Sequence, residues 1–181
     1  MDSDGAAQTL VRLLDLEPHY AEGGYFRQTY ISPQVVESTR GIRSASADSI
    51  LYMLTRDQAR GRLHRNQSDI LHFFHIGDPT EYLTISPEGI VERVVLGPDP
   101  EMGHLLQFNV AAGYWKASYL PPNARFSLVS EVVVPGFDEQ KREIATWTDI
   151  AGQHPDLSEE VLNLTLPIPS TWKLAVRAVD S

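Results

Sequence analysis

Between residues 49 and 134 the chain alternates short apolar runs with turns rich in glycine, proline, asparagine and aspartate. Short runs at regular spacing are typical of an antiparallel β-sandwich or barrel. We predict strands over residues 25–30, 49–55, 60–65, 70–76, 81–86, 90–96, 104–110, 114–119 and 125–134. The pattern therefore predicts an all-β fold.

The two ends of the chain carry different patterns. Leu10, Leu13 and Leu14 follow helical spacing and predict a short amphipathic helix over residues 6–16. Residues 32–48 are rich in serine, proline, glycine and arginine, so we expect a loop there. Residues 157–164 predict a short carboxyl-terminal helix, and residues 173–179 fit a last strand. We expect one domain over residues 1–181, with a barrel core over residues 22–137.

Three of the six histidines lie close together between residues 61 and 79. The polar turn at residues 66–69 separates a run ending at Arg65 from an apolar run over residues 70–76, which predicts a β-hairpin. Strand side chains alternate between faces, so His72 should share one face with the other even-numbered residues, and His75 should lie on the opposite face. Both faces are largely apolar, as in the wall of a sandwich or barrel.

Composition limits the classes of function. The formal charge of −9 opposes binding to a phosphate backbone, so we expect no nucleic-acid partner. There is no cysteine, which excludes disulfides and thiolate metal sites and is compatible with a reducing compartment. The amino terminus is acidic and leads into no long apolar run, so we expect no signal peptide, no membrane span and a cytoplasmic location.

Four motifs occur in an order that resembles the cupin superfamily. They are Glu-Gly-Gly-Tyr-Phe-Arg at residues 22–27, His-Arg-Asn-Gln-Ser-Asp at 64–69, Gly-Asp-Pro at 77–79 and Pro-Gly-Phe at 135–137. More narrowly, they are similar to an uncharacterised branch of that superfamily. The resemblance implies a double-stranded β-helix, the jelly-roll barrel, with a short amino-terminal helix and a carboxyl-terminal helical segment outside it. Because one fold hosts many activities, it implies no particular reaction.

The resemblance also bears on metal binding. Cupins that bind a metal use three histidines and a glutamate, and the matching positions here are His64, Asn66, Ile70 and Lys116. One of these four is a usual metal ligand, whereas a transition-metal site needs roughly three protein ligands. We therefore expect no metal and no cofactor. If the position of Ile70 faces the cavity, His72 faces it too, and an unusual metal site that uses His72 stays open as an alternative.

Two classes of function follow from the resemblance. In the first, a metal-independent enzyme acts on a small carbonyl-containing substrate by isomerisation, epimerisation, cyclisation or elimination. Its proposed catalytic residues are His64 and His72, which handle protons, and Lys116, which holds a developing oxyanion. Sugar-nucleotide epimerases of cupin fold offer a metal-free precedent, and Arg62-Leu63-His64 is similar to the sequence before their barrel histidine. The second class is a non-catalytic cupin that binds a small ligand.

Other residues complete these expectations. The candidate substrate-binding residues are Tyr52, Asn66, Phe74, Gln107 and Glu131. Glu22 is expected to brace the amino-terminal strand rather than touch substrate. The aromatic strand over residues 25–30 would be open to pairing if it lay at a sheet edge, so we expect a homodimer that covers it.

Overall fold

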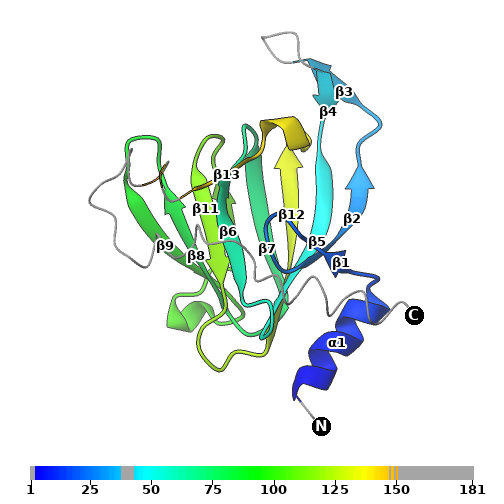
Figure 1. Ribbon diagram of the computed structural model, residues 1–181, viewed down its shortest axis with the longest axis vertical. Coiled ribbons are helices and arrows are strands. Elements are labelled where there is room, and N and C mark those ends of the chain that lie inside the picture. The colour runs from blue at the N-terminus through cyan, green and yellow to red at the C-terminus, as the bar shows by residue number, and fades with distance from the viewer. Residues whose placement is uncertain (1–2, 38–42, 147, 149, 151–181) are drawn as a thin grey trace.

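Two antiparallel sheets face each other and enclose the interior of the protein (Figure 1). The structure is a computed structural model of the 181-residue chain and describes residues 3–37, 43–146, 148 and 150. The expected carboxyl-terminal helix at 157–164 and strand at 173–179 lie outside the described residues. Within the described part of the chain, no helix is long and apolar enough to cross a membrane.

The larger sheet of the described residues has six strands. In spatial order these are β1 (Glu17–Pro18), β2 (Tyr25–Ile31), β5 (Asp48–Thr55), β12 (Phe126–Val134), β7 (Asp69–Gly77) and β10 (Gln107–Val110). Strand β12 lies between β5 and β7 and pairs with both over most of its length. Residues on β12 are thus placed at the centre of the wall.

The facing sheet has five strands among the described residues. Their order is β13 (Glu143–Ile144), β6 (Arg60–Arg65), β11 (Trp115–Tyr119), β8 (Thr80–Ile85) and β9 (Val91–Leu96). Two short 3₁₀ helices, η1 (Pro100–Met102) and η2 (Glu139–Lys141), lie in the connections after β9 and β12. The expected strands therefore form, with small shifts at their ends.

Residues 32–48 contain a small hairpin rather than the expected loop. Strands β3 (Val35–Glu37) and β4 (Arg43–Ala45) pair with each other and extend the arm made by β2 and β5 beyond the barrel (Figure 1). All three β3 residues are exposed. A strand this short, with no buried face, leaves little alternation in the sequence by which it could be recognised.

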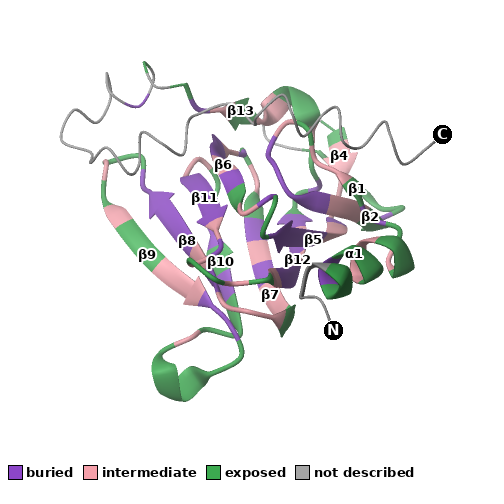
Figure 2. Cartoon of the chain, turned by 60° about the horizontal axis from the view of Figure 1, so that its bottom comes forward, coloured by how far each residue is buried: buried purple, intermediate pink, exposed green. Residues whose placement is uncertain are grey.

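Helix α1 (Ser3–Leu13) begins three residues earlier than expected and packs on the outside of the larger sheet. Its Ala7 joins a buried cluster with Leu16, Tyr25, Met53 and Leu128. In Figure 2 the outward side of this helix is exposed, beside the mainly buried β5 and β12. The outer face of the facing sheet is buried in the same way, by a cluster that contains Trp115 and Ile150.

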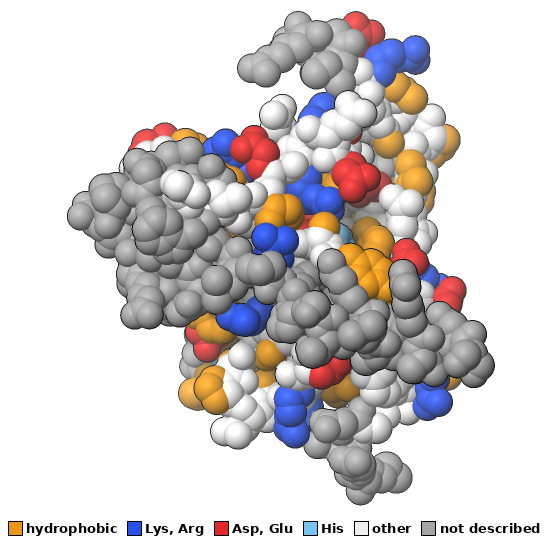
Figure 3. All heavy atoms as spheres, viewed as in Figure 1, with side chains coloured by type: hydrophobic (Ala, Val, Ile, Leu, Met, Phe, Trp, Pro, Cys, Tyr) orange, Lys and Arg blue, Asp and Glu red, His pale blue; other side chains and the backbone are white. Residues whose placement is uncertain are grey.

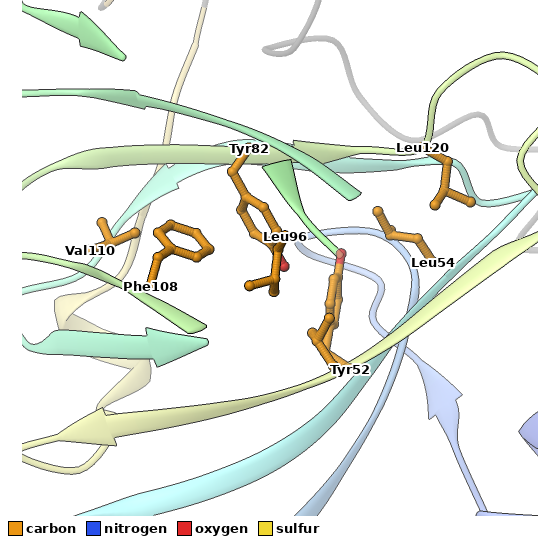
Figure 4. Close-up of a cluster of buried hydrophobic side chains, with 8 residues drawn as sticks. Tyr52, Leu54, Tyr82, Leu96, Phe108, Val110 and Leu120 are labelled. Atoms are coloured by element: carbon orange, nitrogen blue, oxygen red, sulfur yellow. The ribbon is translucent and has the colours of Figure 1, made fainter. Parts of the chain in front are cut away.

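The interior between the sheets is apolar over much of its length. Figure 4 shows its side chains: Tyr52, Leu54, Tyr82, Leu96, Phe108, Val110 and Leu120. They come from strands of both sheets and from the turns that follow them, so each strand contributes alternate residues to one shared core.

The expected hairpin between residues 60–65 and 70–76 is wrong. Strand β6 pairs with β11 and β13, whereas β7 pairs with β12 and β10 in the other sheet. The turn at residues 66–68 therefore carries the chain from one sheet to the other. A short polar turn between two apolar runs gives the same sequence signal in both arrangements, since the signal contains no information about the pairing partner.

The expected alternation along β7 holds for its first half and then breaks. Ile70 and His72 are buried and Phe74 packs against the interior cluster, but Ile76 is exposed. The register with β12 shifts between Leu128 and Val129, so one extra residue of β7 lies there. A β-bulge of this kind turns the following side chain to the other face.

Candidate functional site

Four ionisable side chains from both sheets meet in the interior. His64 on β6 is paired in register with Lys116 on β11, and His72 on β7 is paired with Glu131 on β12. All four residues are buried, with His72 completely inaccessible. The expectation that His64, His72 and Lys116 lie together inside the barrel is therefore met, although they come from opposite walls.

Lys116 links Glu131 to His72. Its Nζ lies 2.9 Å from Glu131 Oε2 and 3.0 Å from His72 Nε2. An ammonium group only donates hydrogen bonds, so Nε2 of a neutral His72 must accept this one and Nδ1 must carry the ring proton. Glu131 Oε1, 3.5 Å from Nε2, then receives no proton from His72.

The charges of this group are fixed by burial and by Lys116. Burial, and next the positive charge of Lys116, lower the pKa of His72 to about 4, so its ring is neutral at pH 7. Burial raises the pKa of Glu131, but Lys116 and then His72 outweigh that effect and hold it well below its usual range. The group is therefore a buried Lys–Glu ion pair next to a neutral histidine.

A tight turn brings a second carboxylate, that of Glu22, into the site. Gly23 and Gly24 follow it with φ values of 95° and 70°, a region that favours glycine. A Cβ on Gly24 would lie 2.7 Å from the Met53 carbonyl oxygen. The turn is also held by the Tyr52 hydroxyl, which donates to the Gly23 carbonyl at 3.0 Å. Both glycines are therefore needed where the chain folds against β5 and β6.

Glu22 and His64 form a second His–Glu pair. His64 Nδ1 lies 2.7 Å from the Arg62 carbonyl oxygen, so Nδ1 carries a proton, and Nε2 faces Glu22 Oε2 at 3.3 Å. Glu22 Oε1 accepts from Arg142 Nη1 at 3.2 Å. With a neutral ring, Nε2 and Oε2 are two acceptors facing each other, which is an arrangement suited to holding one proton between them.

Both members of the pair have lowered pKa values. Burial lowers the pKa of His64, and the nearby Glu22 carboxylate compensates only in part. For Glu22, burial raises the pKa, but the charges of His64, His19 and Lys116 together lower it below its ordinary value. At neutral pH the pair therefore consists of a carboxylate and a neutral imidazole.

A pocket of about 350 Å³ opens beside these groups. Its polar lining residues are Glu17, His19, Glu22, Gln28, Asp48, Asn66 and Glu131, and its apolar ones are Phe26, Ile50, Val133 and Phe137. This volume is at the small end of the range for small-molecule sites. The two carboxylates Glu22 and Glu131 line the pocket directly, whereas His64, His72 and Lys116 are not among its lining residues.

The structure places the other expected site residues in three different settings. Asn66 and Glu131 line the pocket. Tyr52 and Phe74 belong to the interior apolar cluster instead. Gln107 is exposed and pairs in register with Phe73, whereas its neighbour Phe108 stacks on His72. Gln107 thus lies on the outer face, and the structure does not bring it to the pocket, because the alternation of β10 turns its side chain away.

Sequence reasoning missed several residues of the site, among them Asp48 and His19 in the pocket lining and two groups beside His64. Glu22, expected only to brace the first strand, lines the pocket and faces His64. Its signal was available in the two glycines that follow it, which indicate a forced turn. Arg142 contacts Glu22 from a connection 120 residues further along the chain, and no pattern around it indicates that contact.

The donor set does not fit a transition metal. The described residues contain no group of three or more histidine, cysteine, aspartate or glutamate side chains that could hold an ion. At the position that the cupin resemblance gives to the last metal ligand, the structure has the Lys116 ammonium, 3.0 Å from His72. A cation beside this ammonium would be repelled, which also disfavours a site built with His72.

Two facing antiparallel sheets that enclose a polar pocket at one part of an apolar interior define a cupin-type barrel. Similar solved structures support this class. A hypothetical protein from Leishmania major has a TM-score of 0.82 at 30% identity, with 90% of this chain and 99% of that chain covered. A protein from Shewanella oneidensis has a TM-score of 0.79 at 29% identity, with 90% and 98% covered.

Sequence comparison narrows the class to one family. Residues 8–145 match the family described as Cupin superfamily (DUF985), and the chain belongs to that family. An uncharacterized protein of Saccharomyces cerevisiae, YML079W, is 36% identical over 132 residues. That match covers 66% of this chain and 65% of the yeast protein, so the chain spans just under two thirds of that relative.

Proposed function

We propose that this cupin is a metal-independent isomerase, epimerase, cyclase or lyase for a small carbonyl compound, with Glu22 and His64 as its proton-transfer pair. The observation that carries the proposal is that the Glu22 carboxylate lines the pocket while its Oε2 lies 3.3 Å from His64 Nε2. A carboxylate that can pass a proton to a neutral histidine behind it is suited to general acid–base catalysis.

The proposed step begins at the substrate carbon next to the carbonyl group. Glu22 Oε2 accepts the proton of that C–H bond, whose electron pair forms the enolate. His64 Nε2 can take the proton from Oε2, because its Nδ1–H is already held by the Arg62 carbonyl. Return of the proton from Glu22 to a neighbouring atom gives isomerisation. Reprotonation of the enolate carbon by water from the opposite face, with the first proton lost to solvent, gives epimerisation, and departure of a β-substituent with its bonding electron pair gives elimination. The Asn66 amide, which lines the pocket, supplies N–H donors for the carbonyl oxygen.

The roles expected for Lys116 and His72 change in this proposal. Lys116 donates to Glu131 and His72, so it fixes the charge of Glu131 rather than holding a developing oxyanion. His72 is completely buried behind Glu131 and acts as a positioning residue. The partners expected are small molecules. In Figure 3 acidic and basic side chains are interspersed over the visible face, an arrangement that offers little to a phosphate backbone.

The proposal is tested by exchange of substrate protons with solvent. Protein treated with a chelator and checked by elemental analysis is incubated in D₂O with a panel of aldoses, ketoses and hydroxyketones, and loss of the proton next to the carbonyl is followed by NMR. We expect catalysed exchange without metal, and a loss of at least about 10²-fold in Glu22→Gln and His64→Ala. The matched control is His75→Ala, since His75 is exposed and contacts Ser130 on the outer face.

Three results would contradict the proposal. Exchange that needs stoichiometric iron, zinc or manganese would support the metal-dependent alternative. Binding of a panel compound without exchange would support a non-catalytic cupin. Full activity in Glu22→Gln would remove the proposed base, whatever the reaction.

A further inference from the structure

The pocket wall is unusually rich in carboxylates. Glu17, Glu22, Asp48 and Glu131 line it, and the described part of its lining contains no lysine or arginine. Among the described residues, two of these carboxylates have a cationic partner: Glu131 has Lys116 and Glu22 has Arg142. Glu17 and Asp48 have no cationic partner among the described residues, so the pocket wall keeps an excess of negative charge.

Asp48 is the carboxylate whose position calls for a partner. It begins β5, is 4% exposed, and its Oδ2 accepts a hydrogen bond from the Phe137 backbone N–H at 2.5 Å. Burying a carboxylate without a cation is costly, and burial accordingly raises the pKa of Asp48. A positively charged group in the pocket would supply the missing partner.

A buried acceptor at the same site points to a ligand rich in hydrogen-bond donors. Asn66 lines the pocket, is 8% exposed, and its Oδ1 has no hydrogen-bond partner among the described residues. A buried acceptor left without a donor costs about 1–3 kcal/mol. An ammonium group offers three donors and no acceptor, so it matches Asn66 Oδ1 as well as the charge of Asp48.

We propose that the substrate carries a protonated amine that is recognised by Asp48 and Asn66, so that it belongs to the class of amine-bearing carbonyl compounds, such as amino sugars. The aromatic ring of Phe26 lines the same pocket and favours a cation further. Carboxylated and phosphorylated compounds are disfavoured, because their negative charge would lie close to the carboxylates of Glu22, Asp48 and Glu131. The carbonyl group of this substrate rests on the proposed function, whereas its amine follows from the charges and the unpaired acceptor of the pocket wall.

The test uses binding rather than turnover. Two sets of probes each share a carbon framework and include an ammonium, a neutral and an anionic member: glucosamine, glucose and glucuronate, and benzylamine, benzyl alcohol and benzoate. Binding is measured at pH 7 by ligand-observed NMR and by thermal shift. We expect the ammonium member of at least one set to bind at least about tenfold more tightly than its neutral and anionic analogues. We expect Asp48→Asn to remove that preference, and Glu92→Gln, an exposed change on β9, to leave it unchanged.

The outcomes separate this inference from the proposed function. Equal or tighter binding of the anionic analogues, or no binding of either ammonium probe, overturns it. A preference for ammonium that persists in Asp48→Asn overturns the role of Asp48. If the preference is absent while Glu22→Gln still abolishes proton exchange, the amine fails and the proton-transfer pair stands. If the preference is present and no exchange is found, the recognition of the amine stands and the proton-transfer pair fails.

Discussion

At the scale of single residues, the ion pair of Lys116 and Glu131 is the feature on which the site most depends. Both residues are buried, and Nζ and Oε2 are 2.9 Å apart. Removing one partner of a buried pair leaves an uncompensated charge, whereas replacing both by apolar groups is often neutral. The pair therefore fixes the charge pattern of the interior more than it adds stability.

The first prediction tests this asymmetry. We expect Lys116→Met to lower the free energy of unfolding by roughly 3–5 kcal/mol, because Glu131 would be buried without its cation. We expect the double variant Lys116→Met with Glu131→Leu to recover most of that loss. Denaturant unfolding of both variants measures the difference. A double variant that is less stable than the single one would show that the pair has a net stabilising effect.

The second prediction concerns pH and His72. Its pKa in the folded state is about 4, below the ordinary value of 6.5, so below pH 6.5 the unfolded chain binds a proton that the folded chain does not. The stability that His72 contributes is therefore complete above pH 6.5 and is lost as the pH falls toward 4. Between pH 7 and pH 5 the loss is about 2 kcal/mol.

The measurement is urea unfolding at pH 7 and pH 5 in the wild type and in His72→Asn, whose amide can still accept from Lys116. We expect the variant to lose less stability over this interval, by about 2 kcal/mol. The remaining loss includes that of His64, whose pKa is also lowered. Identical losses in the two proteins would mean that His72 does not titrate below its usual range.

At the scale of elements, the turn before β2 places the base of the proposed reaction. Gly24 has φ of 70°, and a Cβ there would meet the Met53 carbonyl at 2.7 Å. We expect Gly24→Ala to cost about 1–3 kcal/mol and to displace Glu22 from His64. The control is Gly5→Ala in α1, where a Cβ meets nothing within 4 Å and which we expect to be neutral or stabilising. Urea unfolding and the exchange assay together check the prediction.

The strands were predictable from sequence, whereas their pairing was not. Alternation of apolar residues locates β5, β7 and β12 because it reflects which side chains are buried. It does not indicate which strand lies beside which, and so β6 and β7 were expected to pair although they belong to different sheets. The exposed strand β3 shows no alternation of apolar residues, and the bulge in β7 interrupts the alternation there.

The site was predictable in part, because alternation indicates which side chains face the interior but not which segments lie side by side. His64, His72 and Lys116 follow from alternation and from the cupin motifs. Arg142 precedes β13 directly and reaches Glu22 because β13 pairs with β6, which is a tertiary contact between distant segments. Gln107 was misplaced because the face of β10 that is buried depends on its pairing with β7.

At the scale of the whole molecule, the arm made by β2 and β5 and extended by β3 and β4 carries exposed apolar side chains. Tyr30, Ile31 and Val35 are each more than half exposed. Beyond Phe26, β2 has no partner on the side away from β5 among the described residues. The expected homodimer stays a prediction: light scattering at micromolar concentration should give twice the monomer mass, and Ile31→Glu should reduce it. A strictly monomeric wild type would contradict it.

The contact between Lys116 and Glu131 also has a consequence for how the protein folds. Lys116 is on β11 in one sheet, and Glu131 is on β12 in the other, so the pair exists only after the two sheets have assembled. Until then each side chain is hydrated at little cost. Any state in which only one sheet has formed would therefore lack the buried pair, the pocket and the lowered pKa values that the proposed chemistry uses.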